Sequence, residues 1–216
     1  MADDRLAILV PDGTYLAVLR QLFETRGQSL GIREIGFDII KDALHDSSPE
    51  TVLLLRPYLR SCTHALVFRD LHGSGSETEG AEALEKTLLA ELCANGWTRD
   101  KAEVIVVDPE IEAWLRFDST HLADLAQKRA RRNREQAELL FPTVRNRAIV
   151  ATGGMAPTGK PKKPKETFET ILREFGIQRS NSLYGGLAEK ESLQDCAAPS
   201  FQRLITILRR WFPASS

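Results

Sequence analysis

The sequence predicts an α/β protein in which helices flank a mostly parallel β-sheet and a helical region follows on the C-terminal side. Short apolar runs, each closed at once by a turn, alternate with segments whose apolar residues recur at helical spacing. The runs are apolar throughout, which is typical of strands buried on both faces of a parallel sheet. A length of 216 residues fits one principal domain.

The predicted α/β core covers residues 1–118. Its expected strands span residues 6–10, 32–40, 65–68 and 104–107. Helical spacing is found at residues 16–23, 52–59, about 78–95 and 110–116. Gly96 is the expected C-terminal stop of the third of these helices, because glycine tolerates the left-handed backbone found there. Pro109 separates the fourth strand from the helical stretch that follows.

Residues 119–216 are expected to form a helical extension that packs on the core as part of the same domain. Helical periodicity continues from Asp118 to about Leu140. We expect Pro142 to end that helix, because proline lacks the backbone N–H that a helix interior needs. The remaining expected elements are a Gly/Pro/Lys loop at 153–165, mobile unless bound, and helices at 168–175 and 201–212.

Composition limits the possible partners. A formal net charge of −1 means that any nucleic-acid binding must come from a local patch. No stretch approaches the roughly 20 apolar residues that span a bilayer, so no membrane partner and no secretion are expected. Cys62, Cys93 and Cys196 lie far apart without CxxC spacing, which favours reduced thiols and a cytoplasmic location.

Polar residues follow the predicted strands at the point where each strand ends. Asp12, Asp70, His72 and Asp108 hold these positions, and ligands of parallel sheets bind at the carboxyl ends of strands. Carboxylates that converge on one edge repel each other unless a cation lies between them. Their hard oxygen atoms suit Mg²⁺ or Mn²⁺, so the sequence predicts a divalent-metal site.

A simpler interpretation exists for two of these residues. Asp12 and Asp108 lie beside glycine or proline, where aspartate is favoured by turn geometry alone. Asp70 differs, because the sequence Asp-Leu-His-Gly-Ser-Gly puts a carboxylate and an imidazole just before a glycine loop that a ligand could approach closely. A functional role is therefore favoured for Asp70.

The segment Pro-Glu-Ile-Glu-Ala-Trp-Leu-Arg-Phe-Asp contains two further candidates, Glu112 and Asp118. Packing of the apolar Ile111 and Trp114 would hold Glu112 in a fixed orientation, as a metal ligand requires. The alternative is that the early glutamates only oppose the positive end of a helix.

Lysines concentrate positive charge in the proline-rich loop. Lys160, Lys162, Lys163 and Lys165 suit contacts with phosphate groups of a nucleic acid. The alternative is a solvated loop, and a solvated helix face is the favoured interpretation of a second basic cluster at 128–134. The spacing of a phosphate-binding P-loop is not met, since Pro161 follows Lys160.

These motifs together resemble the Toprim-like proteins of bacterial defence systems, relatives of the Toprim domain of OLD-type nucleases. The resemblance lies in the strand-turn-helix opening, Asp70 at the third strand, the Glu-Ala-Trp segment with Asp118, the Pro/Lys segment, and the stretches at 183–188 and 196–204. It implies a Rossmannoid fold. In Toprim domains a glutamate after the first strand transfers protons and an Asp-x-Asp pair after the third binds magnesium; this chain has Asp12 and Asp70-Leu71-His72 there.

Two functional hypotheses follow from the resemblance. In the first, the chain is a Mg²⁺- or Mn²⁺-dependent nuclease of an anti-phage defence system, with an ATPase or nuclease subunit as partner. The residues expected to act there are Asp70, His72, Glu112 and Asp118 on the metal, Asp12, Asp70 and Glu112 in catalysis, and Lys160, Lys162, Lys163 and Lys165 on nucleic acid. In the second, a catalytically degenerate Toprim fold serves as a binding or regulatory subunit.

Overall fold

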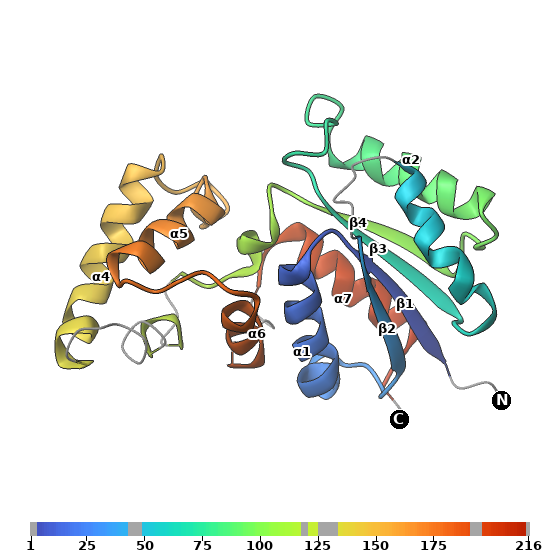
Figure 1. Cartoon of the computed structure of the whole chain (residues 1–216), viewed down its shortest axis with the longest axis horizontal. Coiled ribbons are helices and arrows are strands. Elements are labelled where there is room, and N and C mark those ends of the chain that lie inside the picture. The colour runs from blue at the N-terminus through green and yellow to red at the C-terminus, as the bar shows by residue number, and fades with distance from the viewer. Residues whose placement is uncertain (1–3, 43–48, 118–120, 125–133, 191–195, 215–216) are drawn as a thin grey trace.

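A computed structural model describes residues 4–42, 49–117, 121–124, 134–190 and 196–214. Its centre is a parallel four-stranded sheet with the strand order β2-β1-β3-β4 (Figure 1). The strands are β1 Arg5–Val10, β2 Gly36–Lys41, β3 His64–Asp70 and β4 Ala102–Val107. The predicted α/β class with a parallel sheet and a helical C-terminal region is therefore confirmed, and the arrangement is consistent with a Rossmannoid fold.

The two faces of the sheet bury alternate residues of β1, β3 and β4, whereas the edge strand β2 is only partly buried. Leu6, Ile8 and Val10 of β1 belong to one apolar cluster, whereas Ala7 and Leu9 belong to another. Helices α1 (Gly13–Leu30) and α7 (Pro199–Trp211) contribute to the first cluster, and the 3₁₀ helix η1 (Pro49–Arg60) and α2 (Ala81–Ala94) to the second. Figure 1 shows these pairs on opposite sides of the sheet. Burial on both faces explains why the middle residues of β1, β3 and β4 are largely apolar.

Two expected boundaries in the core are wrong by a few residues. The second strand begins at Gly36 rather than at Ile32, because Ile32 pairs with Pro213 in an isolated antiparallel bridge. The helical stretch expected at 110–116 is only the short 3₁₀ helix η2 (Ile111–Trp114). Gly96 does follow α2 in the left-handed region, with φ of 102°, as predicted.

The C-terminal region contains α4 (Arg134–Ala151), α5 (Pro164–Glu174) and α6 (Asn181–Lys190). Figure 1 shows α4 and α5 to one side of the sheet, with α6 between them and α1. The expected helix end at Pro142 is wrong, since α4 continues through it. Phe141, Val144 and Ala148 are buried around this position. Their burial outweighs the lost backbone hydrogen bond.

The lysine-rich segment is partly helical. Helix α5 begins at Pro164, so Lys165 belongs to its first turn rather than to the expected loop. The preceding residues form a hydrogen-bonded turn, in which Ala156 N donates to Lys160 O at 2.7 Å and Lys162 N to Gly154 O at 3.0 Å. In the described part of the chain, no helix has the length and apolar character needed to cross a bilayer.

Candidate functional site

Four carboxylates lie near the carboxyl edge of the sheet, and we call this group the acidic edge: Asp12, Asp70, Glu110 and Glu112. Asp70 is the last residue of β3, and the Tyr15 hydroxyl donates a very short hydrogen bond to its Oδ1. Asp12 follows β1, and its Oδ1 accepts hydrogen bonds from the backbone N–H groups of Thr14 at 2.8 Å and Tyr15 at 3.1 Å. Asp12 is therefore the N-cap of α1, and this cap fixes the turn that presents Tyr15 to Asp70.

The protonation of Asp70 is strongly perturbed. Burial raises the pKa of its carboxyl group to about 7, and the negative charges of Asp12, Glu110 and Glu112 act in the same direction. The hydrogen bond from Tyr15 opposes this shift, because it stabilises the carboxylate form. Burial and the nearby Asp70 charge also raise the pKa of Tyr15, which keeps its hydroxyl protonated as a donor. Asp70 thus titrates near neutral pH.

Glu112 lies in η2 and is almost completely buried, with 1% of its surface exposed. Its Oε1 accepts hydrogen bonds from the Tyr184 hydroxyl at 2.6 Å and from Arg179 Nη2 at 3.4 Å. Arg179 also pairs with Glu169 at 2.9 Å, which holds the guanidinium between two carboxylates. Burial raises the pKa of Glu112, whereas Tyr184 and Arg179 both favour its charged form.

Glu110 is buried and has a cationic partner of its own. Its Oε1 accepts a hydrogen bond from Lys165 Nζ at 2.6 Å. The pair raises the pKa of Lys165, even though partial burial of the ammonium acts in the opposite direction. His72 Nδ1 lies 3.9 Å from the same carboxylate oxygen, and the His72 side chain is largely exposed. The expected histidine is therefore at the edge, beside Glu110.

Aromatic packing holds η2 in place. The Trp114 indole N–H donates to Ser200 Oγ at 2.9 Å, and its ring meets Phe201 edge-to-face at a centroid distance of 5.1 Å. These contacts hold η2 against α7, in agreement with the prediction that packing of Trp114 fixes the segment that carries Glu112. Tyr184 belongs to α6, and the first residue of that helix, Asn181, lies close to Gly13 at the start of α1. A Cβ on Gly13 would overlap the Asn181 amide, so the glycine allows α6 to approach α1 this closely.

Among the carboxylates of the acidic edge, Asp70 is the one whose surroundings suit binding of a divalent cation. In the ranges that the structure describes, no three His, Cys, Asp or Glu side chains are close enough together to hold a metal ion. Asp118, a predicted ligand, lies outside the described residues. Mg²⁺ is usually bound through one or two protein carboxylates, with water and substrate phosphates completing its shell. Asp70 suits this role, because its bonded partner is a neutral tyrosine, whereas Glu110 and Glu112 are each paired with a cation.

The four predicted phosphate-binding lysines separate into two kinds. Lys165 is paired with Glu110, and Lys160 Nζ donates to the backbone carbonyl of Leu115 at 2.7 Å. Lys162 and Lys163 are exposed on the surface. The basic cluster at 128–134 lies outside the described residues, apart from the backbone of Arg134.

Sequence reasoning missed Tyr15, Tyr184 and Arg179. Tyr15 could have been found from its place in the first turn after Asp12, where a helix residue faces the end of the neighbouring strand. Tyr184 and Arg179 are more than 60 residues from Glu112 along the chain, and no local pattern pairs them with it. Asp108 is exposed after β4, so it does not join the buried carboxylates.

No family model, curated protein or solved structure matches this chain. The roles proposed below therefore rest on the geometry of the acidic edge and on the resemblance of the sequence motifs to Toprim-like proteins.

Proposed function

We propose that the acidic edge is a Toprim-like site for Mg²⁺- or Mn²⁺-dependent cleavage of nucleic acid, acting in the cytoplasm as part of a bacterial anti-phage defence system. The observation that carries the proposal is Asp70, a partly buried carboxylate at the end of a central parallel strand. Its pKa is raised to about 7, and three further carboxylates surround it. Perturbed acids of this kind are typical of functional sites. The defence context and an ATPase or nuclease partner are supported by the sequence resemblance.

Asp70 is the residue that would hold the cation. A bound Mg²⁺ or Mn²⁺ supplies positive charge that stabilises a phosphoryl group under attack. Within the chain, Tyr15 orients the Asp70 carboxylate through its hydrogen bond, and Asp12, whose charge acts on Asp70, is the acid that would transfer a proton. Glu112 supports the site from below the surface, since it is nearly fully buried and its bonded Oε1 is occupied by Tyr184 and Arg179.

A cation is also what allows a nucleic acid to approach this edge. Phosphodiester groups are anionic, and the acidic edge would repel them without an intervening positive charge. Lys162 and Lys163 are exposed on the turn before α5, and that helix carries the Lys165 partner of Glu110. These two lysines suit non-specific contacts with the backbone of a strand that enters the site.

The test is cleavage of plasmid DNA, single-stranded DNA and RNA by the purified chain with Mg²⁺ or Mn²⁺. We expect cleavage that Asp70→Asn abolishes, because the amide keeps the shape of the side chain and removes the charge. Asp108→Asn is the matched control, since Asp108 directly follows the adjacent strand β4 but is exposed. Absence of cleavage on all three substrates, or equal cleavage by both variants, would refute the proposal.

A second candidate is a catalytically degenerate Toprim fold that serves as a binding or regulatory subunit. The two ion pairs favour it, because the partly exposed Lys165 and Arg179 already place positive charge on the buried Glu110 and Glu112. In this case the chain would associate with a larger nuclease or ATPase irrespective of Asp70. Co-purification of such a partner with wild-type protein and with Asp70→Asn in equal yield, without metal-dependent cleavage, would establish this alternative.

A further inference from the structure

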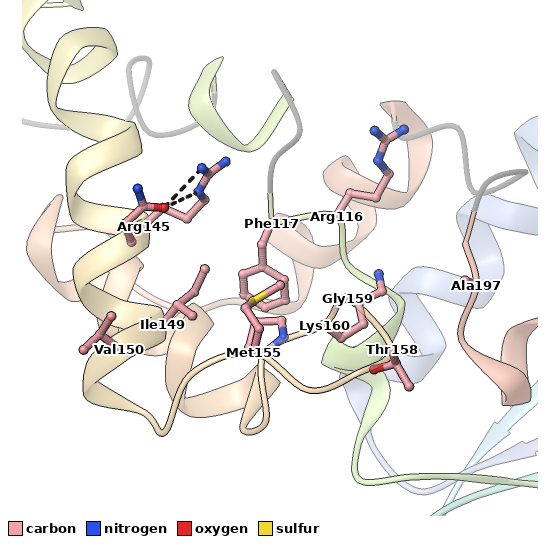
Figure 2. Close-up of a pocket in the computed structure, with 12 residues that line it drawn as sticks. Arg116, Phe117, Arg145, Ile149, Val150, Met155, Thr158, Gly159, Lys160 and Ala197 are labelled. Carbon is pink, nitrogen blue, oxygen red and sulfur yellow. Dashed lines mark hydrogen bonds between the residues drawn. The ribbon is translucent and has the colours of Figure 1, made fainter.

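A cavity of about 580 Å³ lies between α4 and the turn that precedes α5, away from the acidic edge (Figure 2). One wall comes from α4 and the other from the turn and from the segment that follows η2. Its volume falls in the range of small-molecule sites, which is about 300–1,000 Å³. The side chains that matter for its chemistry are Arg116, Phe117, Arg145, Ile149, Val150, Met155 and Lys160.

Among the described residues that line the cavity, the charged side chains are all cationic. Arg116, Arg145 and Lys160 come from three different segments, and no Asp or Glu is among these described lining residues. The Lys160 ammonium has three N–H donors, one of which forms a hydrogen bond to the Leu115 carbonyl. The Arg145 guanidinium donates two hydrogen bonds to the amide oxygen of the adjacent Asn146, at 3.2 and 3.3 Å (Figure 2). The cavity therefore favours an anionic ligand.

The uncharged lining suits a flat apolar group. Val150 and Met155 expose 76% and 48% of their surface, although both are apolar. Phe117 also lines the cavity, and its ring packs edge-to-face on Phe168. Exposed apolar side chains gathered around a cavity mark a binding surface. An apolar surface beside arginines is also the usual combination for an unstacked base and its phosphate.

The cavity is linked to the edge of the sheet. A second cavity shares Thr158, Lys160, Pro161 and Ala197 with it and extends to Asp108 and Pro109 at the end of β4. Arg116 and Phe117 follow Glu112 by only a few residues along the chain. A strand bound in the first cavity could therefore continue towards the acidic edge.

We propose that this cavity binds one unpaired nucleotide of a single-stranded nucleic acid, with the base against Phe117, Val150 and Met155 and the phosphate held by Arg145 and Lys160. A base that is paired within a duplex cannot enter a cavity of this kind without leaving its stack. The inference names the substrate class of the proposed function and rests on it for the link to cleavage. Binding itself requires neither Asp70 nor a metal.

The experiment measures fluorescence anisotropy of a labelled oligothymidylate of about eight nucleotides, with the full chain in EDTA. The same titration uses an oligouridylate and a DNA duplex of equal length. We expect at least about tenfold tighter binding of one single strand than of the duplex. Equal affinity for the duplex would overturn the proposal. Competition by free thymidine monophosphate at the affinity of the strand would also overturn it, since the ligand would then be a mononucleotide.

Two matched variants on α4 locate the binding. Arg145→Gln removes a charge from the cavity, and Arg147→Gln removes one from the same helix outside it, where Arg147 pairs with Glu174 at 2.7 Å. We expect Arg145→Gln to weaken binding about tenfold and to lower the salt dependence by about one counterion, with Arg147→Gln close to wild type. Equal weakening by the two variants would indicate non-specific attraction and overturn the proposal.

A third variant fills the cavity rather than changing its charge. Val150→Trp places a large ring at an exposed position, so the fold should tolerate it. We expect strand binding to fall about tenfold or more while the circular dichroism spectrum is unchanged. Unchanged affinity would contradict insertion of a base. Because all measurements are made without metal, a chain that binds single strands but does not cleave them would refute the proposed function alone.

Discussion

Asp70 and Glu112 lie at the same edge of the sheet and each accepts a hydrogen bond from a tyrosine, yet their surroundings differ in charge. Glu112 is bonded to Tyr184 and also to the Arg179 guanidinium, which the C-terminal region provides. Asp70 is bonded to Tyr15, and its pKa is raised to about 7. The C-terminal region thus neutralises Glu110 and Glu112, whereas Asp70 is left to titrate near neutral pH. Asp70 is therefore the carboxylate that an external cation would stabilise most.

The largest expected effect on the free energy of unfolding comes from removing the cation that is paired with Glu112. Arg179→Met would leave the buried Glu112 carboxylate with Tyr184 as its bonded partner. Breaking a buried ion pair costs about 3–5 kcal/mol, and we expect about 2 kcal/mol because Arg179 is partly exposed. The loss should be greater at pH 8 than at pH 5, since Glu112 can be protonated more readily at low pH. Urea denaturation at the two pH values measures it.

The matched control for this change is Arg173→Met in α5, whose guanidinium donates a hydrogen bond to the Thr170 hydroxyl at 3.2 Å. It should alter the free energy of unfolding by less than about 0.5 kcal/mol. A similar loss of unfolding free energy in the two variants would contradict the prediction that Arg179 stabilises the Glu112 carboxylate.

Asp70→Asn should have a smaller effect of the opposite sign. The folded-state pKa of Asp70 is about 7, above the ordinary 3.8, so the folded protein retains a proton that the unfolded chain loses between these values. The Asp70 contribution to stability therefore decreases as pH rises from about 4 to about 7 and is constant above that. We expect the variant to be about 1.5 kcal/mol more stable than wild type at pH 8, with little difference at pH 4.

Denaturant titrations of wild type and Asp70→Asn across this pH range provide the measurement. Asp108→Asn is again the control, and it should follow the wild-type profile because Asp108 is exposed. If the stability of Asp70→Asn varied with pH as that of the wild type does, Asp70 would titrate as an ordinary carboxyl group. The difference proposed between Asp70 and Glu112 would then be contradicted.

The smallest expected effect concerns the second ion pair. Lys165→Met removes the partner of Glu110, and we expect a loss of about 1 kcal/mol, since Lys165 is partly exposed and His72 remains nearby. Lys163→Met, two residues earlier and exposed, should change stability by less than about 0.3 kcal/mol. Thermal unfolding of the two variants at pH 8 compares them directly. A loss confined to Lys163→Met would contradict the assignment.

The sheet could be predicted because each strand is short, apolar and followed by a turn, so local pattern and tertiary burial agree. The course of α4 through Pro142 could not, because burial of Phe141 and Val144 against distant residues overrides the local effect of proline. Asp70 and Glu112 were predicted from their positions after a strand and before Trp114. Their partners Tyr184 and Arg179 were not, since only the packing of α6 against α1 brings them to the edge.

The central claim is that Asp70 binds the metal ion, and the most direct test is to measure Mn²⁺ binding at pH 8. Electron paramagnetic resonance detects the bound Mn²⁺, and a single-stranded phosphorothioate oligonucleotide is present in the sample. We expect the wild type and Asp108→Asn to bind Mn²⁺ and Asp70→Asn to lose binding. Below pH 7 the wild-type affinity should fall about tenfold per pH unit, because the metal then competes with the proton on Asp70. Equal binding by wild type and Asp70→Asn, or no binding by either, would contradict the assignment of Asp70 as the metal ligand.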